Sequence, residues 1–217
     1  MAEAGFVCGI DVSHFQGQID WEKVAGSGVK FAFIKATDGA AGTDARFDAN
    51  WREAKAAGVR SGAYHFFRAE QDAEQQARLF VRKLNDDWGE LPAVLDFEVL
   101  GQATAEQAID GAVRWMELVE AASGKRPMLY TGPSFWKAQA KDSAAFCDYP
   151  LWIAHYTSGA HPSLPAAWKQ WTFWQHSEQG SVPGITGPVD LDRFYGNAME
   201  LAALGARISL KSATAGY

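Results

Sequence analysis

The sequence predicts a single-domain α/β fold, an irregular (β/α) barrel with about eight strands and fewer helices than a regular TIM barrel. Short apolar segments of strand length recur along the whole chain, and helical patterns separate the early segments but not the late ones. Parallel strands that are buried on both faces read as continuous apolar runs, as these segments do. A closed or nearly closed barrel is therefore favoured over an open, doubly wound sheet.

The candidate strands begin near the N-terminus and continue to residue 194. Each is an apolar run of strand length, bounded by polar residues or by glycine and proline. They cover residues 6–12, 31–36, 61–67, 93–98, 127–131, 151–156, 171–176 and 189–194.

Helical patterns lie between the early strands. They cover residues 44–57, 70–84 and 104–122, and a short helix is expected at 133–140. Thr104 and Gln107 have the spacing of a capping box, in which each side chain bonds the other residue's backbone N–H. Residues 158–167 contain two prolines and are expected to form a loop.

The length and composition fit one compact domain. The chain has 217 residues, of which 47% are hydrophobic and 21% charged, enough to bury a sizeable core. No repeat, low-complexity tract or linker interrupts residues 5–205. Residues 1–206 are therefore expected to form one barrel domain and residues 207–217 a C-terminal tail.

The composition argues against several classes of protein. The 20 Lys and Arg against 26 Asp and Glu give a net charge of −6, which would repel a phosphate backbone, so nucleic acid is not an expected partner. Neither a run of about 18 apolar residues nor a signal-peptide pattern is present, so no membrane segment or leader is expected. Two cysteines and no Gly-rich phosphate-binding motif predict no structural disulfide, zinc or other cofactor.

Carboxylates at predicted strand ends are the strongest functional signal. In an α/β barrel, functional side chains lie at the C-terminal ends of the strands. Asp11 ends the first predicted strand, Asp96 and Glu98 end the fourth, and Asp190 lies in the last strand, which neighbours the first in a closed barrel. All four acids are therefore expected at one mouth of the barrel.

Asp96 and Glu98 are expected to act as a pair. They are two residues apart on a strand, so their side chains leave the same face with Cα atoms roughly 6.6 Å apart. Two acids held so close do not both ionise readily, so one keeps a proton near neutral pH while the other stays an anion. Cleavage of a glycosidic bond needs both a proton for the leaving oxygen and a negative charge near the reacting carbon.

Two other interpretations of the acids stay open. They could be salt-bridged structural residues, although burying charge beside a barrel core without a function is costly. They could also hold Mg²⁺, Ca²⁺ or Mn²⁺, but the five histidines are scattered and no known metal-binding spacing occurs, so no metal is expected. His14 and His65 fit hydrogen-bonded supports better than proton carriers.

Aromatic and polar residues near the same strand ends are expected to bind substrate. The chain has 9 Trp, 13 Phe and 6 Tyr, more than a core usually needs, and flat rings with polar tips can stack sugars. Phe66 and Trp152 are the two that alternation favours as barrel core, and Lys35 is either a partner for the acids or a surface charge. The expected substrate-binding residues are Tyr64, His65, Phe66, Tyr130, Trp152, Tyr156, Trp174, Gln175 and Lys35.

Six groups of residues, taken in chain order, carry a resemblance to a known family. They are GIDVSHFQG at 9–17, FAFIKAT at 31–37, GAYHFF at 62–67, LDFE at 95–98, LWIAHY at 151–156, and WQ at 174–175 with VDLDRF at 189–194. Together they resemble glycoside hydrolase family 25, the 1,4-β-N-acetylmuramidases or lysozymes, over about residues 6–195. The resemblance implies an irregular eight-stranded barrel that cleaves peptidoglycan between N-acetylmuramic acid and N-acetylglucosamine.

The resemblance also implies roles for the acids. Glu98 matches the family's proton donor, and Asp96, Asp11 and Asp190 match its supporting acids. The family resembles a retaining one in which the substrate's own N-acetyl group is the nucleophile, with Asp96 polarising it or acting as nucleophile itself. At residues 37–39 this chain has Thr-Asp-Gly, where the family often has Thr-Glu-Gly.

The leading hypothesis is a lysozyme that acts on the cell wall outside the cytoplasm. One alternative is a wall-glycan binding module without turnover, although a binder has no need of a paired acid. Another is a chitinase-like glycosidase, which the lack of a longer acidic run before Glu98 disfavours. A net charge of −6 gives no attraction to anionic walls, so a delivery or targeting protein is an expected partner besides peptidoglycan.

Overall fold

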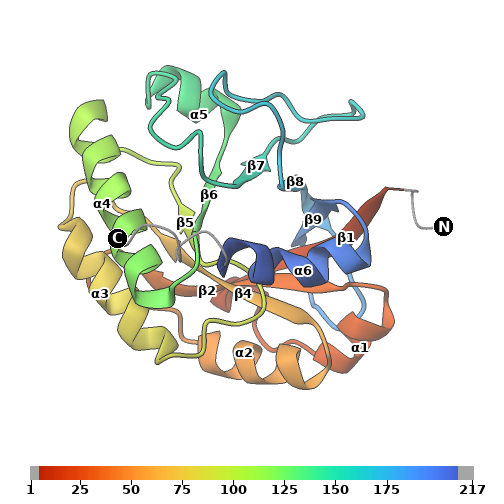
Figure 1. Cartoon of the computed structure of the whole chain (residues 1–217). Helices are drawn as coiled ribbons and strands as arrows, with labels where there is room; N and C mark the ends of the chain where they lie inside the picture. Colours follow the sequence, from red (N-terminus) through yellow and green to blue (C-terminus); the bar gives the residue numbers. More distant parts are fainter. Residues whose placement is uncertain (1–4, 210–217) are drawn as a thin grey trace.

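The computed structural model describes residues 5–209, and eight strands among them close into a barrel (Figure 1). β1 pairs with β2 on one side and with β9 on the other, which completes the ring, and the predicted irregular barrel is confirmed. The barrel strands are β1 Phe6–Val12, β2 Phe31–Asp38, β4 Arg60–Phe66, β5 Val94–Asp96, β6 Met128–Thr131, β7 Leu151–Ala154, β8 Phe173–Gly180 and β9 Val189–Tyr195. A two-residue strand, β3 Gly42–Thr43, pairs only with the end of β2.

The last barrel strand runs against the others. The seven barrel strands β1, β2 and β4 to β8 are parallel to one another, whereas β9 is antiparallel to both β8 and β1. Asp190 lies at the start of β9, and this reversal brings the start of β9 to the same mouth as the ends of the parallel strands. Asp190 therefore reaches the expected mouth, but through a change of strand direction that the sequence interpretation did not include.

Helices cover one side of the barrel and are sparse on the other (Figure 1). Their bounds are α1 Trp21–Gly26, α2 Phe47–Ala56, α3 Ala73–Leu84, α4 Ala105–Ser123, α5 Pro133–Ala138 and α6 Ala198–Ser209, with a 3₁₀ turn at His14–Gln16. The predicted capping box at the start of α4 is present, because Thr104 Oγ1 accepts from the Gln107 N–H at 3.2 Å and Gln107 Oε1 accepts from the Thr104 N–H at 3.0 Å. Residues 158–167 form a loop, as expected, whereas α1 and α6 were not predicted.

Two hydrophobic cores follow from the alternation of side chains along each strand. One fills the inside of the barrel with rings, among them Phe33 stacked on Trp152 with centroids 4.4 Å apart. The other lies between the strands and the helices and includes Leu95 and Ile153. The interior leaves little room, since a Cβ added at Gly9 would come within 2.3 Å of the Phe31 ring. The filled interior leaves the mouth as the place for a site.

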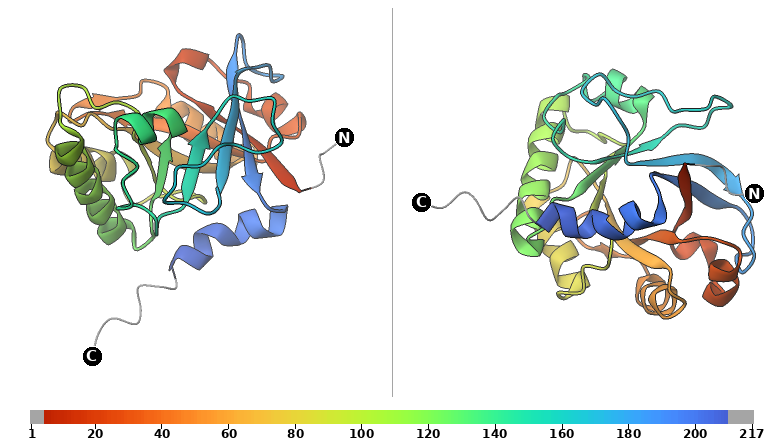
Figure 2. Two further views of the ribbon diagram at one scale, coloured as in Figure 1. Left: turned by 90° about the horizontal axis from the view of Figure 1, so that it is seen from above. Right: turned by 45° about the vertical axis from the view of Figure 1, so that its right-hand side comes forward.

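Helix α6 lies across the end of the barrel away from that mouth (Figure 2, left). Leu201 is buried with the rings of the barrel interior, and Leu204 packs beside it. The helix starts with a reciprocal cap in which Asn197 Oδ1 accepts from the Glu200 N–H and Glu200 Oε2 accepts from the Asn197 N–H. The expected tail began at residue 207; α6 continues through Ser209, and residues 210–217 lie outside the described residues.

The cysteines and the helices within residues 5–209 bear on disulfides and on membrane segments. Cys8 and Cys147 are free thiols on the surface. No helix in this part of the chain combines the length and the apolar character needed to cross a bilayer.

Candidate active site

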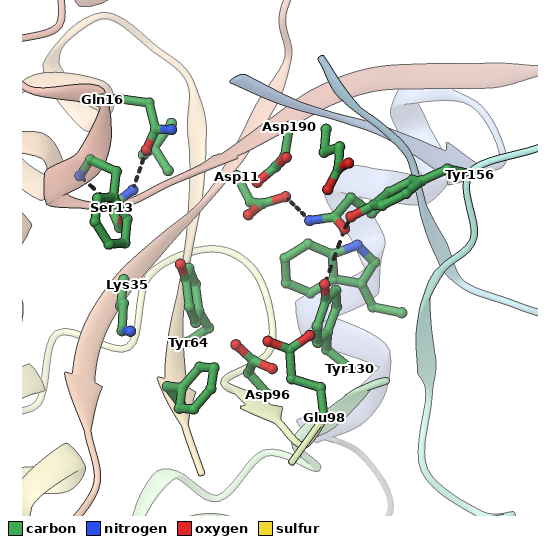
Figure 3. Close-up of a pocket in the computed structure, with 16 residues that line it drawn as sticks. Asp11, Ser13, Gln16, Lys35, Tyr64, Asp96, Glu98, Tyr130, Tyr156 and Asp190 are labelled. Atoms are coloured by element: carbon green, nitrogen blue, oxygen red, sulfur yellow. Dashed lines mark hydrogen bonds between the residues drawn. The ribbon is translucent and has the colours of Figure 1, made fainter. Parts of the chain in front are cut away.

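A cavity of about 330 Å³ opens at the mouth of the barrel (Figure 3). It lies where the parallel strands end and β9 begins, as the position of functional sites in α/β barrels requires. Most of the site residues expected from the sequence line it, namely Asp11, Lys35, Tyr64, Phe66, Asp96, Glu98, Tyr130, Trp152, Tyr156, Gln175 and Asp190. Phe66 and Trp152, which alternation favoured as core, therefore also border the cavity.

Asp96 and Glu98 point into the cavity from the end of β5 (Figure 3). Phe97, between them, is buried in the outer core, so strand alternation turns both acids to the same side. Burial raises the pKa of both carboxyls, and the charge of Glu98 raises the pKa of Asp96 further. Asp96 Oδ1 is buried and has no hydrogen-bond partner. The pair can thus keep a proton at pH values where free carboxyls are ionised, and both side chains line the cavity.

A second group of acids faces this pair. Asp11 and Asp190 are cross-strand partners on β1 and β9, and Asp192 lies deeper, where its Oδ1 accepts from Trp152 Nε1 at 2.8 Å. Burial raises the pKa of Asp11, and the neighbouring charges of Asp192 and Asp190 raise it further. Within residues 5–209, no group of three or more His, Cys, Asp or Glu side chains is arranged to hold a metal ion.

Gln175 connects the second acid group to two tyrosines. Its Nε2 donates to Asp11 Oδ2 at 2.7 Å, while its Oε1 accepts from the hydroxyls of Tyr130 at 3.0 Å and Tyr156 at 2.7 Å. Burial raises the pKa of both tyrosines, so they stay protonated phenols. Because both hydroxyl protons go to Gln175, the phenol oxygens remain as acceptors for a ligand.

Basic side chains stand on the β2 and β4 side of the cavity. Lys35 Nζ and Arg68 Nε each lie 2.8 Å from a carboxylate oxygen of Asp38. Their positive charges oppose the effect of burial and lower the pKa values of Asp96 and Glu98. Lys35 is therefore a charge partner of the acids at a distance and makes its direct ion pair with Asp38.

The family model described as "Glycosyl hydrolases family 25" matches residues 10–185 of this sequence. The chain belongs to glycosyl hydrolase family 25. The resemblance carried by the six groups of residues is thereby confirmed, and the barrel with its acid-lined mouth is the family 25 domain of this protein.

Relatives and solved structures of family 25 agree with this assignment. "Uncharacterized protein YegX" of Escherichia coli K12 is 40% identical over 200 residues, which cover 90% of this chain and 72% of that protein. Lysozyme M1 of Streptomyces globisporus is 35% identical over 218 residues, covering 94% of this chain and 72% of that protein. The crystal structure of the bacterial lysozyme from Streptomyces coelicolor superposes with a TM-score of 0.86 at 33% identity, covering 95% of this chain and 100% of that one.

His65 and Trp174 do not line the cavity of this family 25 domain, and their expected place beside the substrate is corrected here. Both point to the outer side of the barrel wall, because they alternate with Tyr64 and Gln175, which point inward. His65 is buried beside the Trp115 ring, with centroids 5.4 Å apart. The Nε1–H of Trp174 donates to the backbone oxygen of His155 at 2.8 Å.

His14 also lies outside the cavity lining of the family 25 site. Its Nδ1 lies 2.8 Å from Asp44 Oδ2, and its backbone N–H donates to the same oxygen at 2.9 Å. This agrees with the expectation that it is a hydrogen-bonded support.

Two segments of the family 25 site contribute cavity residues that were not predicted from the sequence. Val12, Ser13, Phe15 and Gln16 line it from the end of β1 and the turn that follows. They lie within the motif at 9–17, which was the available signal. Glu178 lines it from β8, which extends to Gly180 and so beyond the predicted end at 176.

Proposed function

We propose that this protein is a lysozyme, a muramidase that hydrolyses the β-1,4 bond between N-acetylmuramic acid and N-acetylglucosamine in peptidoglycan. The observation that carries the proposal is the placement of Asp96 and Glu98 together in a tyrosine-lined cavity, opposite Asp11 and Asp190. Two acids with raised pKa values in one cleft fit glycoside cleavage. The lysozymes among the similar proteins support the same activity.

Glu98 is proposed as the acid. It lines the cavity, and burial raises its pKa, so its carboxyl holds a proton at pH values where a free glutamate would be ionised. This proton passes to the glycosidic oxygen as the bond to the anomeric carbon breaks, and the leaving sugar departs with a neutral hydroxyl group.

Asp96 is proposed to assist the substrate's own nucleophile. Its side chain lines the cavity, and its carboxylate can accept the N–H of the acetamido group on the N-acetylmuramic acid. The acetamido oxygen then forms a bond to the anomeric carbon from the face opposite the leaving group. This produces a cyclic intermediate, an exception to the scheme with two carboxylates.

Water completes the reaction from the face that the leaving sugar has vacated. Glu98, now a carboxylate, takes a proton from this water while the water oxygen attacks the anomeric carbon. The bond between the acetamido oxygen and the anomeric carbon breaks in the same step. Two displacements at one carbon restore the β configuration. We assign Asp11 and Asp190 the support of positive charge that develops on the sugar ring, because both line the opposite wall.

The proposed activity also indicates where the protein acts and what it binds. The substrate is peptidoglycan, so the enzyme acts on the cell wall outside the cytoplasm, and the net charge of −6 disfavours nucleic acid as a partner. A delivery or targeting protein would compensate for the lack of attraction to an anionic wall. The proposed catalytic unit is the barrel, and α6 is the last helix among residues 5–209.

The test digests purified peptidoglycan and reduces the products with borohydride. The proposal predicts new reducing ends on muramic acid, and new ends on glucosamine would overturn it. The first product detected by proton NMR should be the β anomer. Preferential hydrolysis of chitin oligomers would favour a chitinase-like enzyme, and wall binding without release of fragments would favour a binding module.

A separate variant tests whether Glu98 is the general acid. Glu98→Gln should lower the rate about 10²- to 10⁴-fold, the usual contribution of a general acid, while Glu106→Gln on the exposed start of α4 serves as the matched control. A wild-type rate in Glu98→Gln would show that another group supplies the proton.

A further inference from the structure

Phe15 is an apolar ring that the fold leaves in water at the edge of the cavity. The Phe15 side chain is 80% exposed, and among the described residues Met199 on α6 is equally exposed. Phe15 lines the cavity, whereas Met199 does not. Burial of a large apolar side chain is favourable, and this ring borders the cavity, so it offers an apolar surface that a bound ligand can cover.

The turn that carries Phe15 is held in place by its neighbours. Ser13 Oγ accepts from the Phe15 N–H at 3.3 Å, and Gln16 Oε1 accepts from the Ser13 N–H at 2.9 Å. Arg46 Nε donates to the backbone oxygen of Gly17 at 3.0 Å and so ties the end of the turn to the start of α2. A ligand that binds to a turn already fixed in this way loses little affinity to ordering it.

The Phe15 ring also has a support behind it. The His14 ring lies beside it, with centroids 4.1 Å apart and an interplanar angle of 35°. His14 is fixed through its Nδ1 to Asp44, whose side chain is 1% exposed. Phe15 is therefore a supported ring with a free surface at the cavity.

A second exposed ring stands on another part of the rim. Tyr156 is 48% exposed and is fixed by its hydroxyl to Gln175. Figure 3 shows Ser13 and Gln16, the neighbours of Phe15, on the opposite side of Asp11 from Tyr156. The cavity thus has an aromatic residue on either side of its acid wall, an arrangement that suits a chain of sugars longer than the two rings at the cleaved bond.

We propose that Phe15 is a stacking platform for a pyranose ring of the glycan strand, on the β1 side of the cavity. This inference rests on the proposed function and adds to it a residue that determines how the strand is held. The C–H face of a pyranose is apolar, and it can cover an aromatic face while the hydroxyl groups of the sugar stay in water.

The experiment measures binding without turnover. In the Glu98→Gln background, the Kd for an octasaccharide of peptidoglycan glycan without stem peptides is measured by calorimetry. Adding Phe15→Ala should weaken binding about 5- to 10-fold, the scale expected for one aromatic contact, and Phe15→Trp should restore it. Met199→Ala is the matched control, an equally exposed apolar side chain outside the cavity, and should leave Kd unchanged.

Two results would overturn the proposal: a Kd for Phe15→Ala within about twofold of the parent, or a Phe15→Trp variant that binds no better than Phe15→Ala. Because Phe15 is exposed, the variants should keep the melting temperature of the parent, which separates lost contact from lost fold. Failure of the wild type to release muramic acid ends would instead refute the proposed function, since the binding series does not depend on turnover.

Discussion

Acid should destabilise this fold through one buried histidine, and His65→Phe should remove most of that effect. His65 is fully buried, and burial lowers its pKa from 6.5 to about 4. Its Nε2 lies 3.0 Å from Gln76 Oε1, which only accepts, so Nε2 carries the hydrogen and Nδ1 accepts from the Thr37 hydroxyl at 2.7 Å. The native protein therefore holds a neutral imidazole.

The direction of the pH effect follows from the two pKa values. In the unfolded chain, His65 takes a proton near pH 6.5, whereas the folded protein resists protonation down to about pH 4. The stability contributed by the neutral form is complete above pH 6.5 and is lost as the pH falls toward 4. The loss in free energy of unfolding from this one residue is about 2 kcal/mol at pH 5 and about 3 kcal/mol at pH 4.

The assay is urea unfolding of the wild type and of His65→Phe between pH 7 and pH 4. Phenylalanine keeps a ring beside Trp115 but does not titrate, and the carboxylates are the same in both proteins. The variant should be less stable at pH 7, because the Thr37 hydroxyl loses its partner. The gap between the two proteins should then shrink by about 2 kcal/mol from pH 7 to pH 5. Two stability curves that stay parallel over this range would refute the reasoning.

Two further variants test the electrostatics of the cavity. Lys35→Met removes a positive charge that lowers the pKa of Glu98, so the alkaline limb of kcat/KM against pH should move to higher pH; an unmoved limb would show that Lys35 does not act on the acid. Asp192→Asn keeps an oxygen for Trp152 and removes a buried carboxyl group whose pKa is raised by burial. It should raise the free energy of unfolding at pH 7 by about 1–2 kcal/mol, and the gain should fade in acid as the native Asp192 and Asp11 take up protons; a lower melting temperature at pH 7 would contradict this.

Most of the barrel could be predicted because its strands are apolar on both faces. The direction of β9 was missed, although a signal was present. Twelve residues, 177–188, separate the last two predicted strands, and their prolines and glycines (Pro183, Gly184, Gly187 and Pro188) do not suit a helix. A parallel crossover of about this length is usually made by a helix, so this connection suits a hairpin better. Helix α6 was missed although Asn197 and Glu200 have the spacing of a capping box ahead of an apolar run. Its place across the end of the barrel depends on the burial of Leu201, which the local sequence does not reveal.

The site was predictable where residue type and strand alternation agreed. Asp96 and Glu98 share a face, and both line the cavity. His65 was included because of its chemistry, although it alternates with Tyr64 and so had to face the helices. The hydrogen bonds of Gln175 could not be predicted from the sequence, because its partners Tyr130 and Asp11 are 45 and 164 positions away in the chain.

The pairing of β1 with β9 has a consequence for when the enzyme becomes active. Asp11 comes from the first strand of the barrel and Asp190 from the last, and they meet as cross-strand partners. A ribosome must therefore release nearly the whole domain before the two acids can come together. A nascent or truncated chain that ends before β9 lacks one wall of the cavity, so the complete site forms only after the whole barrel has been synthesised.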